Sequence, residues 1–229
     1  LGFSVSSAGD VNGDGYDDLA VGEPGHDEGG GTDNGRILLW YGGPSVLSGD
    51  HDVTLLGDDG FGLGEHVAMG DVNCDGYADL VGGAPWTSGG AVHVAYGGEA
   101  GLSGAWDWSW EEPQTAAGLG VVELGDVDGD GCDELLAGAP NYDVGPGDEG
   151  AVFVFGGAPD GLDAGWDALL FGPAAGDGYG YAMAVADFDA DGYADLAAAA
   201  PFTEAGTVFV HAGSATGLAP VPYRSLSSN

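Results

Sequence analysis

A fifteen-residue segment occurs four times in this chain, and this repeat limits the folds that the chain can adopt. The segment DVNGDGYDDLAVGEP begins at Asp10, and related segments begin at Asp71, Asp126 and Asp187. Successive starts are 61, 55 and 61 residues apart, a period typical of proteins built from stacked copies of one small unit. Each copy is therefore expected to bury its apolar surface against the next copy.

Each repeat has the pattern of four short strands, which in the first repeat cover residues 3–9, 18–22, 36–42 and 51–57. Gly and Pro interrupt the chain often, and no apolar helical period persists. Four antiparallel strands repeated radially describe a β-propeller blade. A β-sandwich of about sixteen strands is the alternative, which the strict repeat disfavours. The second strand of each repeat is rich in Ala and Gly, so we expect it near the axis where the sheets converge.

The predicted fold is therefore an all-β propeller of four-stranded antiparallel blades, with no helix longer than about two turns. Residues 1–229 form a single propeller domain or a fragment of one. The expected blades cover approximately residues 1–58, 59–115, 116–175 and 176–229.

The charge of the chain excludes several classes of partner. There are 38 Asp and Glu residues against 2 Lys and Arg, which gives a formal net charge of -36. Such a chain cannot neutralise nucleic-acid phosphates or adhere to anionic membranes, and no apolar run is long enough for membrane insertion. Its natural partners are cations. A solvated acidic surface is the simpler explanation of the charge, but it does not account for acids at fixed offsets.

The acidic segment of each repeat has oxygen-bearing residues at alternate positions of a nine-residue loop. Side chains at positions 1, 3, 5 and 9, with the backbone carbonyl at position 7, can surround one cation, and Gly at position 6 allows the sharp turn. The candidate ligands are Asp10, Asn12, Asp14, Tyr16 and Asp18 in loop one; Asp71, Asn73, Asp75, Tyr77 and Asp79 in loop two; Asp126, Asp128, Asp130, Cys132 and Glu134 in loop three; and Asp187, Asp189, Asp191, Tyr193 and Asp195 in loop four.

An all-oxygen ligand set without His or Cys side chains favours Ca²⁺ over Zn²⁺ or Cu²⁺. Mg²⁺ is less suitable because it retains its waters. We therefore predict up to four Ca²⁺ ions, which would neutralise the carboxylates and hold the turn before the second strand. An acidic Asx-turn without a metal is the alternative for any one loop.

The two cysteines, Cys74 and Cys132, lie in acidic loops of different repeats. A disulfide would require these loops to touch, so we expect separate thiols, each with its pKa raised by nearby carboxylates and therefore unreactive. The side chain of Cys132 is not counted among the metal ligands, because position 7 contributes its carbonyl.

Two short motifs flank each acidic loop. A GAP-like motif follows it, as Gly22-Glu23-Pro24, Gly83-Ala84-Pro85, Gly138-Ala139-Pro140 and Ala199-Ala200-Pro201. A degenerate FG-like motif precedes it, as Leu1-Gly2, Phe61-Gly62, Leu119-Gly120 and Tyr179-Gly180. Together with the loops, these motifs resemble the FG-GAP repeat, the blade unit of the integrin alpha-subunit propeller and of many bacterial surface proteins.

The resemblance covers nearly the whole chain and implies a calcium-bearing propeller. It also implies an extracellular or cell-surface location and a role as an adhesion or ligand-binding scaffold. Integrin-type propellers have seven blades whereas this chain carries four. The chain is therefore a fragment of a larger ring, a small ring, or part of a ring assembled by self-association or with additional blades of a parent chain.

A ligand is expected on the face opposite the calcium loops, where the connections between the second and third strands vary most between repeats. Variable loops on a rigid scaffold commonly carry binding functions, and a protein or a glycan is the expected partner. Idle connectors are the alternative for each residue. The candidate ligand-binding residues are His26, Asp33, Trp86, Tyr142, Asp143, Phe202 and Glu204.

Trp106, Trp108 and Trp110 alternate along the expected fourth strand of the second repeat. They could form a carbohydrate platform, but apolar residues recur at the same places in other repeats, which favours packing between blades. The chain has no H-E-x-x-H, G-x-S-x-G or P-loop motif and no Lys, so a non-enzymatic binding module is favoured. The alternatives are a propeller domain of a polysaccharide-acting enzyme and a structural spacer.

Overall fold

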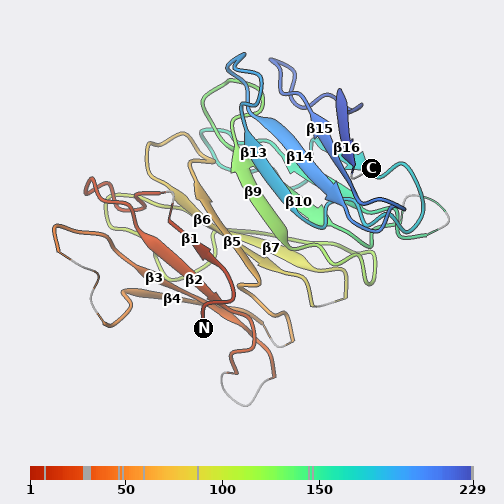
Figure 1. Cartoon of the computed structure of the whole chain (residues 1–229). Coiled ribbons are helices and arrows are strands. Elements are labelled where there is room, and N and C mark those ends of the chain that lie inside the picture. Colours follow the sequence, from red (N-terminus) through yellow and green to blue (C-terminus); the bar gives the residue numbers. More distant parts are fainter. Residues whose placement is uncertain are drawn as a thin grey trace.

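The protein is described here by a computed structural model that covers residues 1–7, 9–27, 32–45, 47, 49–58, 60–86, 88–143, 145 and 147–227. Within these ranges the chain forms sixteen β-strands and no helix. The strands make four separate antiparallel sheets, each of four strands that are neighbours in sequence. Figure 1 shows the sheets following one another from the red first repeat to the blue fourth repeat.

Each sheet is one blade and contains the strands of one repeat. Blade one contains β1 (Val5–Ser6), β2 (Leu19–Glu23), β3 (Arg36–Trp40) and β4 (Val53–Leu56). Blade two contains β5 (His66–Gly70), β6 (Asp79–Ala84), β7 (Ala91–Ala95) and β8 (Trp108–Glu111). Blade three contains β9 (Val121–Gly125), β10 (Glu134–Ala139), β11 (Ala151–Phe155) and β12 (Ala168–Phe171). Blade four contains β13 (Met183–Ala186), β14 (Asp195–Ala200), β15 (Thr207–His211) and β16 (Arg224–Ser227). The all-β propeller predicted from the repeat is confirmed.

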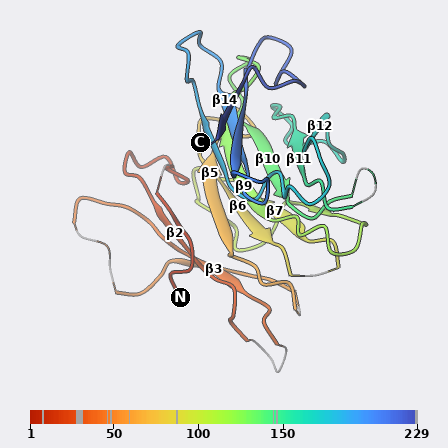
Figure 2. The same ribbon diagram turned by 45° about the vertical axis from the view of Figure 1, so that its right-hand side comes forward.

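The burial of the strands follows from the stacking of the blades. The middle strands of blades two and three, β6, β7, β10 and β11, are buried along their whole length, because a neighbouring blade covers each face. Such strands are continuous apolar runs instead of alternating ones. The last strand of blade four, β16, is exposed along its whole length. Figures 1 and 2 show blades one and four at opposite ends of the series.

The first strand of each blade lies nearest the axis. β1 contacts β5, β5 contacts β9, and β9 contacts β13, whereas the second strands lie one place further out in each sheet. The second strand, which was expected near the axis, lies one place out from the first strand and contacts the first strand of the following blade in two cases, β2 with β5 and β6 with β9. The small residues of the second strand allow the next blade to approach closely.

Glycines of the GAP-like motif allow that approach. A Cβ on Gly22 would lie 1.9 Å from the carbonyl oxygen of Gly64, and a Cβ on Gly83 would lie 1.8 Å from that of Gly120. Gly138 faces Gly180 in the same way, at 2.2 Å. The GAP glycine of one blade therefore packs directly against the FG backbone of the following blade, where no side chain fits.

The same junction corrects the position of the FG-like motif in the second repeat. Parallel bridges join Gly35 to Leu63, Gly90 to Leu119, and Gly150 to Tyr179. The FG-like pair of blade two is therefore Leu63-Gly64, two residues after the Phe61-Gly62 pair that the sequence indicated.

Blade four departs from the pattern at the GAP position. It has Ala199 where the other blades have the GAP glycine. Within the described ranges no FG segment lies against Ala199, so the methyl group meets no backbone of the kind that Gly22, Gly83 and Gly138 face.

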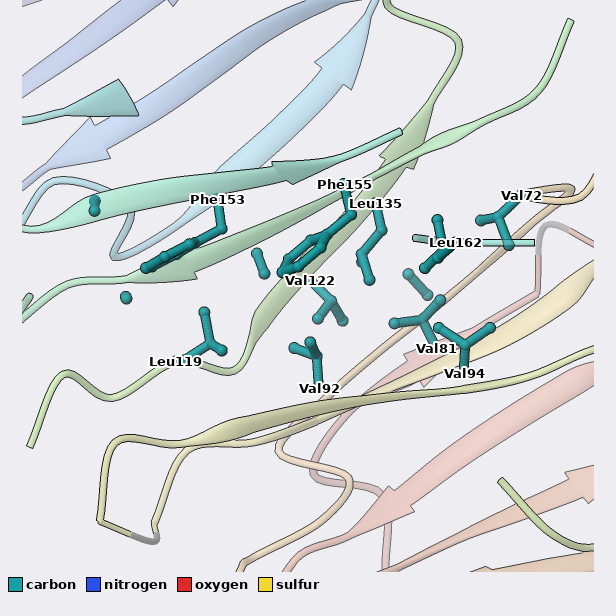
Figure 3. Packing of buried hydrophobic residues seen from close by; sticks show 14 of the residues in the cluster. Val72, Val81, Val92, Val94, Leu119, Val122, Leu135, Phe153, Phe155 and Leu162 are labelled. Atoms are coloured by element: carbon teal, nitrogen blue, oxygen red, sulfur yellow. The ribbon is translucent and has the colours of Figure 1, made fainter. Parts of the chain in front are cut away.

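Three apolar clusters fill the spaces between consecutive blades. One joins blades one and two around Ile37, Leu63 and Leu80, and another joins blades three and four around Leu136 and Tyr179. The cluster between blades two and three is drawn in Figure 3, where Val92 and Val94 of β7 face Phe153, Phe155 and Leu135 across the junction. The hydrophobic core is thus divided among the junctions, so each blade depends on its neighbours.

Trp106, Trp108 and Trp110 pack between blades, as the sequence favoured, but on opposite faces. Trp108 and Trp110 pack against Phe155 of blade three, with ring centroids 5.2 and 5.8 Å away. Trp106 precedes β8, packs with the cluster of blades one and two, and its indole N–H donates to the carbonyl of Leu56 at 3.0 Å. They do not form an exposed platform.

Candidate metal loops and the axial pocket

All four acidic loops connect the first strand of a blade to its second strand and wind in the same way. In loop one, Asp10 accepts hydrogen bonds from the backbone N–H groups of Gly13 at 2.7 Å and Gly15 at 2.7 Å. Asp14 accepts one from the N–H of Tyr16 at 3.0 Å. The first carboxylate of each other loop, Asp71, Asp126 and Asp187, accepts the N–H of the position-6 glycine in the same way.

The position-6 glycines are required by the backbone. Gly15, Gly76, Gly131 and Gly192 have φ values of 89°, 87°, 96° and 98°. A side chain at such a φ is strained, so the sharp turn depends on glycine as the loop pattern predicted.

In loops three and four the winding brings together three of the four predicted side-chain ligands, those at positions 1, 3 and 9. In loop three, carboxylate oxygens of Asp126, Asp128 and Glu134 all lie within 4.8 Å of one another. Asp187, Asp189 and Asp195 do the same in loop four. Loops one and two have Asn12 and Asn73 at position 3, where the amide oxygen takes the place of one carboxylate oxygen. This donor set of oxygens fits a hard divalent cation such as Ca²⁺.

The carboxylate at position 9 has an additional structural role that sequence analysis missed. Asp79 is fully buried and accepts hydrogen bonds from the N–H groups of Val72 at 2.9 Å and Gly97 at 2.8 Å. It therefore ties its own loop to the segment that follows β7. The equivalent carboxylates Asp18, Glu134 and Asp195 accept two backbone N–H groups in the same manner.

Burial disfavours ionisation of Asp79 and Glu134, the position-9 residues of loops two and three. It raises the pKa of Asp79 and that of Glu134 to about 7, and neighbouring carboxylates of the same loop act in the same direction. The backbone hydrogen bonds oppose these effects. A bound cation would favour the ionised form.

Residues at position 7 join consecutive loops. The ring of Tyr77 lies against Gly13 of loop one, and the ring of Tyr193 lies against Gly129 of loop three. Tyr16 has no preceding loop in this chain and is 43% exposed. The backbone N–H at position 7 donates to the carboxylate at position 5 in every loop.

Cys74 and Cys132 form a disulfide, so the expectation of two separate thiols is wrong. The two Cα atoms are 4.8 Å apart, and the residues are separated by 58 positions in sequence. The reason is the stacking of the blades, which places position 4 of one loop beside position 7 of the next. The bond is made by the sulfur of Cys132, whereas the predicted metal ligand is the backbone carbonyl oxygen of the same residue.

The predicted ligand-binding residues of the opposite face have different environments. Tyr142 packs edge-on against Phe153 at 5.2 Å between ring centroids and belongs to the core. Asp143 accepts the backbone N–H of Asp148 and so shapes its own loop. His26 lies 4.0 Å from the carboxylate of Glu23.

Three further candidates are exposed. The backbone carbonyl of Asp33 accepts a hydrogen bond from the N–H of Gly62 at 2.9 Å. Glu204 is exposed on its loop. Phe202 is 62% exposed and packs edge-on against Tyr181, at 5.5 Å between ring centroids.

Trp86 lines a pocket that residues of all four blades surround. The cavity measures about 420 Å³, and a second cavity of about 430 Å³ adjoins it and shares Phe3 and Trp86. The indole N–H of Trp86 donates to Glu65. The lining of the first cavity comprises Phe3, Glu65, His66, Pro85, Trp86, Gly118, Val121, Pro140, Asn141 and Tyr181. We call it the axial pocket because the first strands of blades two and three begin in it.

Of the residues lining the axial pocket, the sequence predicted only Trp86 as a ligand residue. Phe3, Glu65, His66, Asn141 and Tyr181 were missed because they lie next to the FG-like and GAP-like motifs of different repeats. Their proximity to those motifs, which converge at the blade junctions, is the signal that could have found them. Burial lowers the pKa of His66, so its imidazole is neutral at physiological pH.

Comparison with known proteins agrees with this architecture. The FG-GAP repeat matches residues 1–40, 63–95, 121–155 and 179–211. Bovine (Bos taurus) phosphatidylinositol-glycan-specific phospholipase D is 37% identical over 171 residues, which are 68% of this chain and 20% of that protein. Integrin alpha-PS5 of Drosophila melanogaster is 34% identical over 153 residues, or 63% of this chain and 15% of that protein. Human (Homo sapiens) integrin alpha-7 is 32% identical over 150 residues, or 59% of this chain and 12% of that protein.

Among solved structures, rhamnogalacturonan lyase YesW superposes with a TM-score of 0.55 at 14% identity, over 89% of this chain and 46% of that chain. This likeness concerns the fold alone. The chain spans about a fifth or less of the length of the relatives named here.

The stacked four-stranded blades with an acidic loop at the same place in each define a β-propeller of integrin alpha-like type. The chain belongs to the FG-GAP repeat family.

Proposed function

We propose that this chain is a calcium-binding, non-enzymatic propeller module that binds a protein or glycan ligand. The observation that carries the proposal is the identical winding of four acidic loops, each with its first carboxylate hydrogen-bonded to the N–H of the position-6 glycine. Side chains at positions 1, 3, 5 and 9 and the carbonyl at position 7 would hold one Ca²⁺ per loop. The ion would neutralise carboxylates that otherwise repel one another within a single turn.

The metal proposal is tested by stoichiometry. We expect close to four Ca²⁺ per chain by elemental analysis after exhaustive dialysis against micromolar calcium. Asp14→Ala and Asp191→Ala should each remove one ion, because each deletes the position-5 ligand of one loop. Asp160→Ala, an exposed carboxylate outside the loops, is the control that should remove none. Fewer than two ions per wild-type chain would refute the proposal.

We place the ligand on the face opposite the metal loops, at the axial pocket. Three exposed aromatic side chains border this pocket: Phe3, Trp86 and Tyr181, at 65%, 46% and 53% exposure. Glu65 and Asn141 add hydrogen-bonding groups. Exposed rings beside a few polar groups are a common composition of binding sites on rigid scaffolds, and the acidic chain disfavours an anionic ligand.

A panel of immobilised glycans and matrix proteins tests the ligand proposal. Trp86→Ala and Tyr181→Ala should weaken binding of any ligand found, whereas Phe171→Ala should not. Phe171 is 57% exposed but lies on β12, away from the axial pocket. Equal effects of the three variants would contradict this location.

An enzymatic role is the second candidate, because the relatives include a phosphatidylinositol-glycan-specific phospholipase D. Glu65 and His66 are the carboxylate and imidazole side chains that line the axial pocket. Turnover of a polysaccharide or of a glycosylphosphatidylinositol substrate by the isolated chain, abolished by His66→Gln, would favour this role over simple binding.

We propose an extracellular or cell-surface location. The interblade disulfide is the supporting observation, because disulfides persist in oxidising compartments. No helix among the described residues is long and apolar enough to cross a membrane.

We also propose that further blades or a second copy cover the exposed outer blades. The outer face of blade four has an apolar cavity of about 540 Å³ lined by Phe188, Val208, Val210, Tyr223 and Leu226. Sedimentation of the isolated chain tests self-association, which Val208→Asp should abolish. A concentration-independent monomer would leave blades of a longer chain as the proposed cover.

A further inference from the structure

The contact between neighbouring acidic loops is built in two different ways along the chain. Between loops one and two, Tyr77 at position 7 packs on Gly13 at position 4, so that a Cβ on Gly13 would lie 2.5 Å from the ring. Between loops three and four, Tyr193 packs on Gly129 in the same way, and a Cβ on Gly129 would lie 2.6 Å from its ring. Between loops two and three, the same two positions are occupied by Cys74 and Cys132, which are bonded.

The junction with the disulfide is also the one with an added acidic residue in the contact. At the other two junctions the position-8 residues, Ala78 and Ala194, donate a backbone N–H to the position-1 carbonyl of the preceding loop. Asp133 makes that bond to Asp71 at 2.8 Å, and its carboxylate also accepts the N–H of Asp71 at 3.0 Å. A carboxylate is thus placed between two loops that are themselves acidic.

Like charge opposes the contact of the loops at this junction. Loop two carries three carboxylates in its ligand positions, loop three carries four, and Asp133 lies between them; loops three and four, which carry four each, face a similar repulsion. Among the described residues no aromatic ring bridges positions 4 and 7 of loops two and three. The disulfide occupies the place that ring packing has at the other two junctions.

The disulfide joins segments that carry proposed metal ligands. Cys74 lies between the position-3 and position-5 residues of loop two, Asn73 and Asp75, and its φ of 54° is the left-handed conformation of that turn. Cys132 provides the position-7 carbonyl of loop three, and its N–H donates to Asp130 at 2.9 Å. One bond thus constrains ligand segments of two loops.

We propose that Cys74 and Cys132 are positioning residues for the metal sites of loops two and three. Breaking their bond weakens calcium binding at these two loops and leaves loops one and four unchanged. This inference rests on the proposed calcium-binding function. A dithiol such as dithiothreitol would break the bond, because it delivers two electrons and two protons to the S–S bond, gives two thiols, and closes to its own cyclic disulfide.

The test compares three proteins by calorimetric titration with Ca²⁺. They are the oxidised wild type, the pair Cys74→Ser and Cys132→Ser, and the pair Cys74→Gly and Cys132→Tyr. The serine pair retains the residue sizes without the bond, and we expect about tenfold or greater loss of affinity at two sites, the scale of a lost supporting contact at a metal. The glycine and tyrosine pair recreates the other two junctions, and we expect it to recover much of that loss.

Hydrogen exchange in the metal-free proteins provides a readout that does not depend on calcium. Peptides covering residues 71–79 and 126–134 should exchange faster in the serine pair than in the wild type, whereas residues 10–18 and 187–195 should not change. The glycine and tyrosine pair also shows whether a loss in the serine pair comes from the junction or from general misfolding.

The outcomes separate this inference from the proposed function. If the serine pair binds Ca²⁺ at all sites with wild-type affinity and exchanges normally, the positioning role is overturned while calcium binding stands. Uniform weakening at all four sites would also overturn it. If the wild type binds no Ca²⁺, the proposed function fails, and the exchange data alone decide whether the bond orders the two loops.

Discussion

Replacement of the GAP glycine of blade two should show how strongly the blade junctions depend on close backbone contact. In Gly83→Ala the new Cβ would lie 1.8 Å from the carbonyl oxygen of Gly120 and 2.7 Å from its carbonyl carbon. An ordinary carbon–oxygen contact is about 3.3 Å, so the two blades must separate locally by about 1.5 Å. Both partners are backbone atoms, and no side-chain rotation relieves the overlap.

The magnitude follows from the rigidity of that contact. Overpacking a well-packed core costs about 1–3 kcal/mol when side chains can adjust. Here the FG backbone of blade three is itself fixed, because the N–H of Gly120 donates to Gly138 at 3.1 Å. We therefore expect the upper end of the range, about 3 kcal/mol, which for a chain of this size lowers the melting temperature by about 6–12 °C.

Two other substitutions provide matched controls. A Cβ on Gly98 would meet no atom within 4 Å, so Gly98→Ala should change the free energy of unfolding by less than about 0.5 kcal/mol. Ala199→Gly alters the corresponding GAP position of blade four, against which no FG segment packs among the described residues, and should cost only the small increase in backbone freedom.

Urea denaturation in saturating calcium, followed by tryptophan fluorescence, measures the three differences. A loss below 1 kcal/mol in Gly83→Ala, or equal losses in Gly83→Ala and Gly98→Ala, would refute the argument that the FG and GAP backbones are in contact.

Three further predictions concern the metal, pH and the loop contacts. Removal of calcium by excess chelator should lower the melting temperature by well over ten degrees, since each site contributes about 2.7 kcal/mol at a hundredfold excess over Kd. Added magnesium should restore little of this loss. An unchanged melting curve after confirmed metal loss would show that the loops are only acidic turns. His93 is buried and its pKa is lowered to about 4, below its unfolded value, so the unfolded state takes up the proton first. Stability should therefore fall by about 2 kcal/mol between pH 7 and pH 5 from this group, and His93→Gln, measured by denaturation at both pH values, should flatten that slope; an identical slope in the variant contradicts the assignment. Tyr193→Ala should lower the free energy of unfolding by about 1–2 kcal/mol because its ring packs on Gly129. Tyr16→Ala should lower it by less than about 0.5 kcal/mol because Tyr16 is 43% exposed. Equal losses in thermal unfolding would show that the loops do not support one another.

Features that depend on near neighbours in sequence could be predicted without the structure. The nine-residue loops, their position between the first and second strands, and the four strands of each blade all follow from residues a few positions apart. Gly15 and its counterparts are needed at the turn because of their own backbone conformation, and Asp10 reaches its hydrogen-bond partners within five residues. Local geometry of this kind is encoded in short segments, so repetition of the segment was enough to identify the blades.

Features that depend on one blade meeting the next were decided only by the tertiary structure. The Cys74–Cys132 bond, the Leu63-Gly64 register and the axial pocket all join residues of different repeats. The second strand was expected near the axis because its residues are small, and the structure shows that its glycines allow the close approach of the following blade. Distances across a junction depend on how two sheets stack, and residues of different repeats carry no local signal of that stacking. Their contacts form only when the blades pack and bury their shared apolar surface.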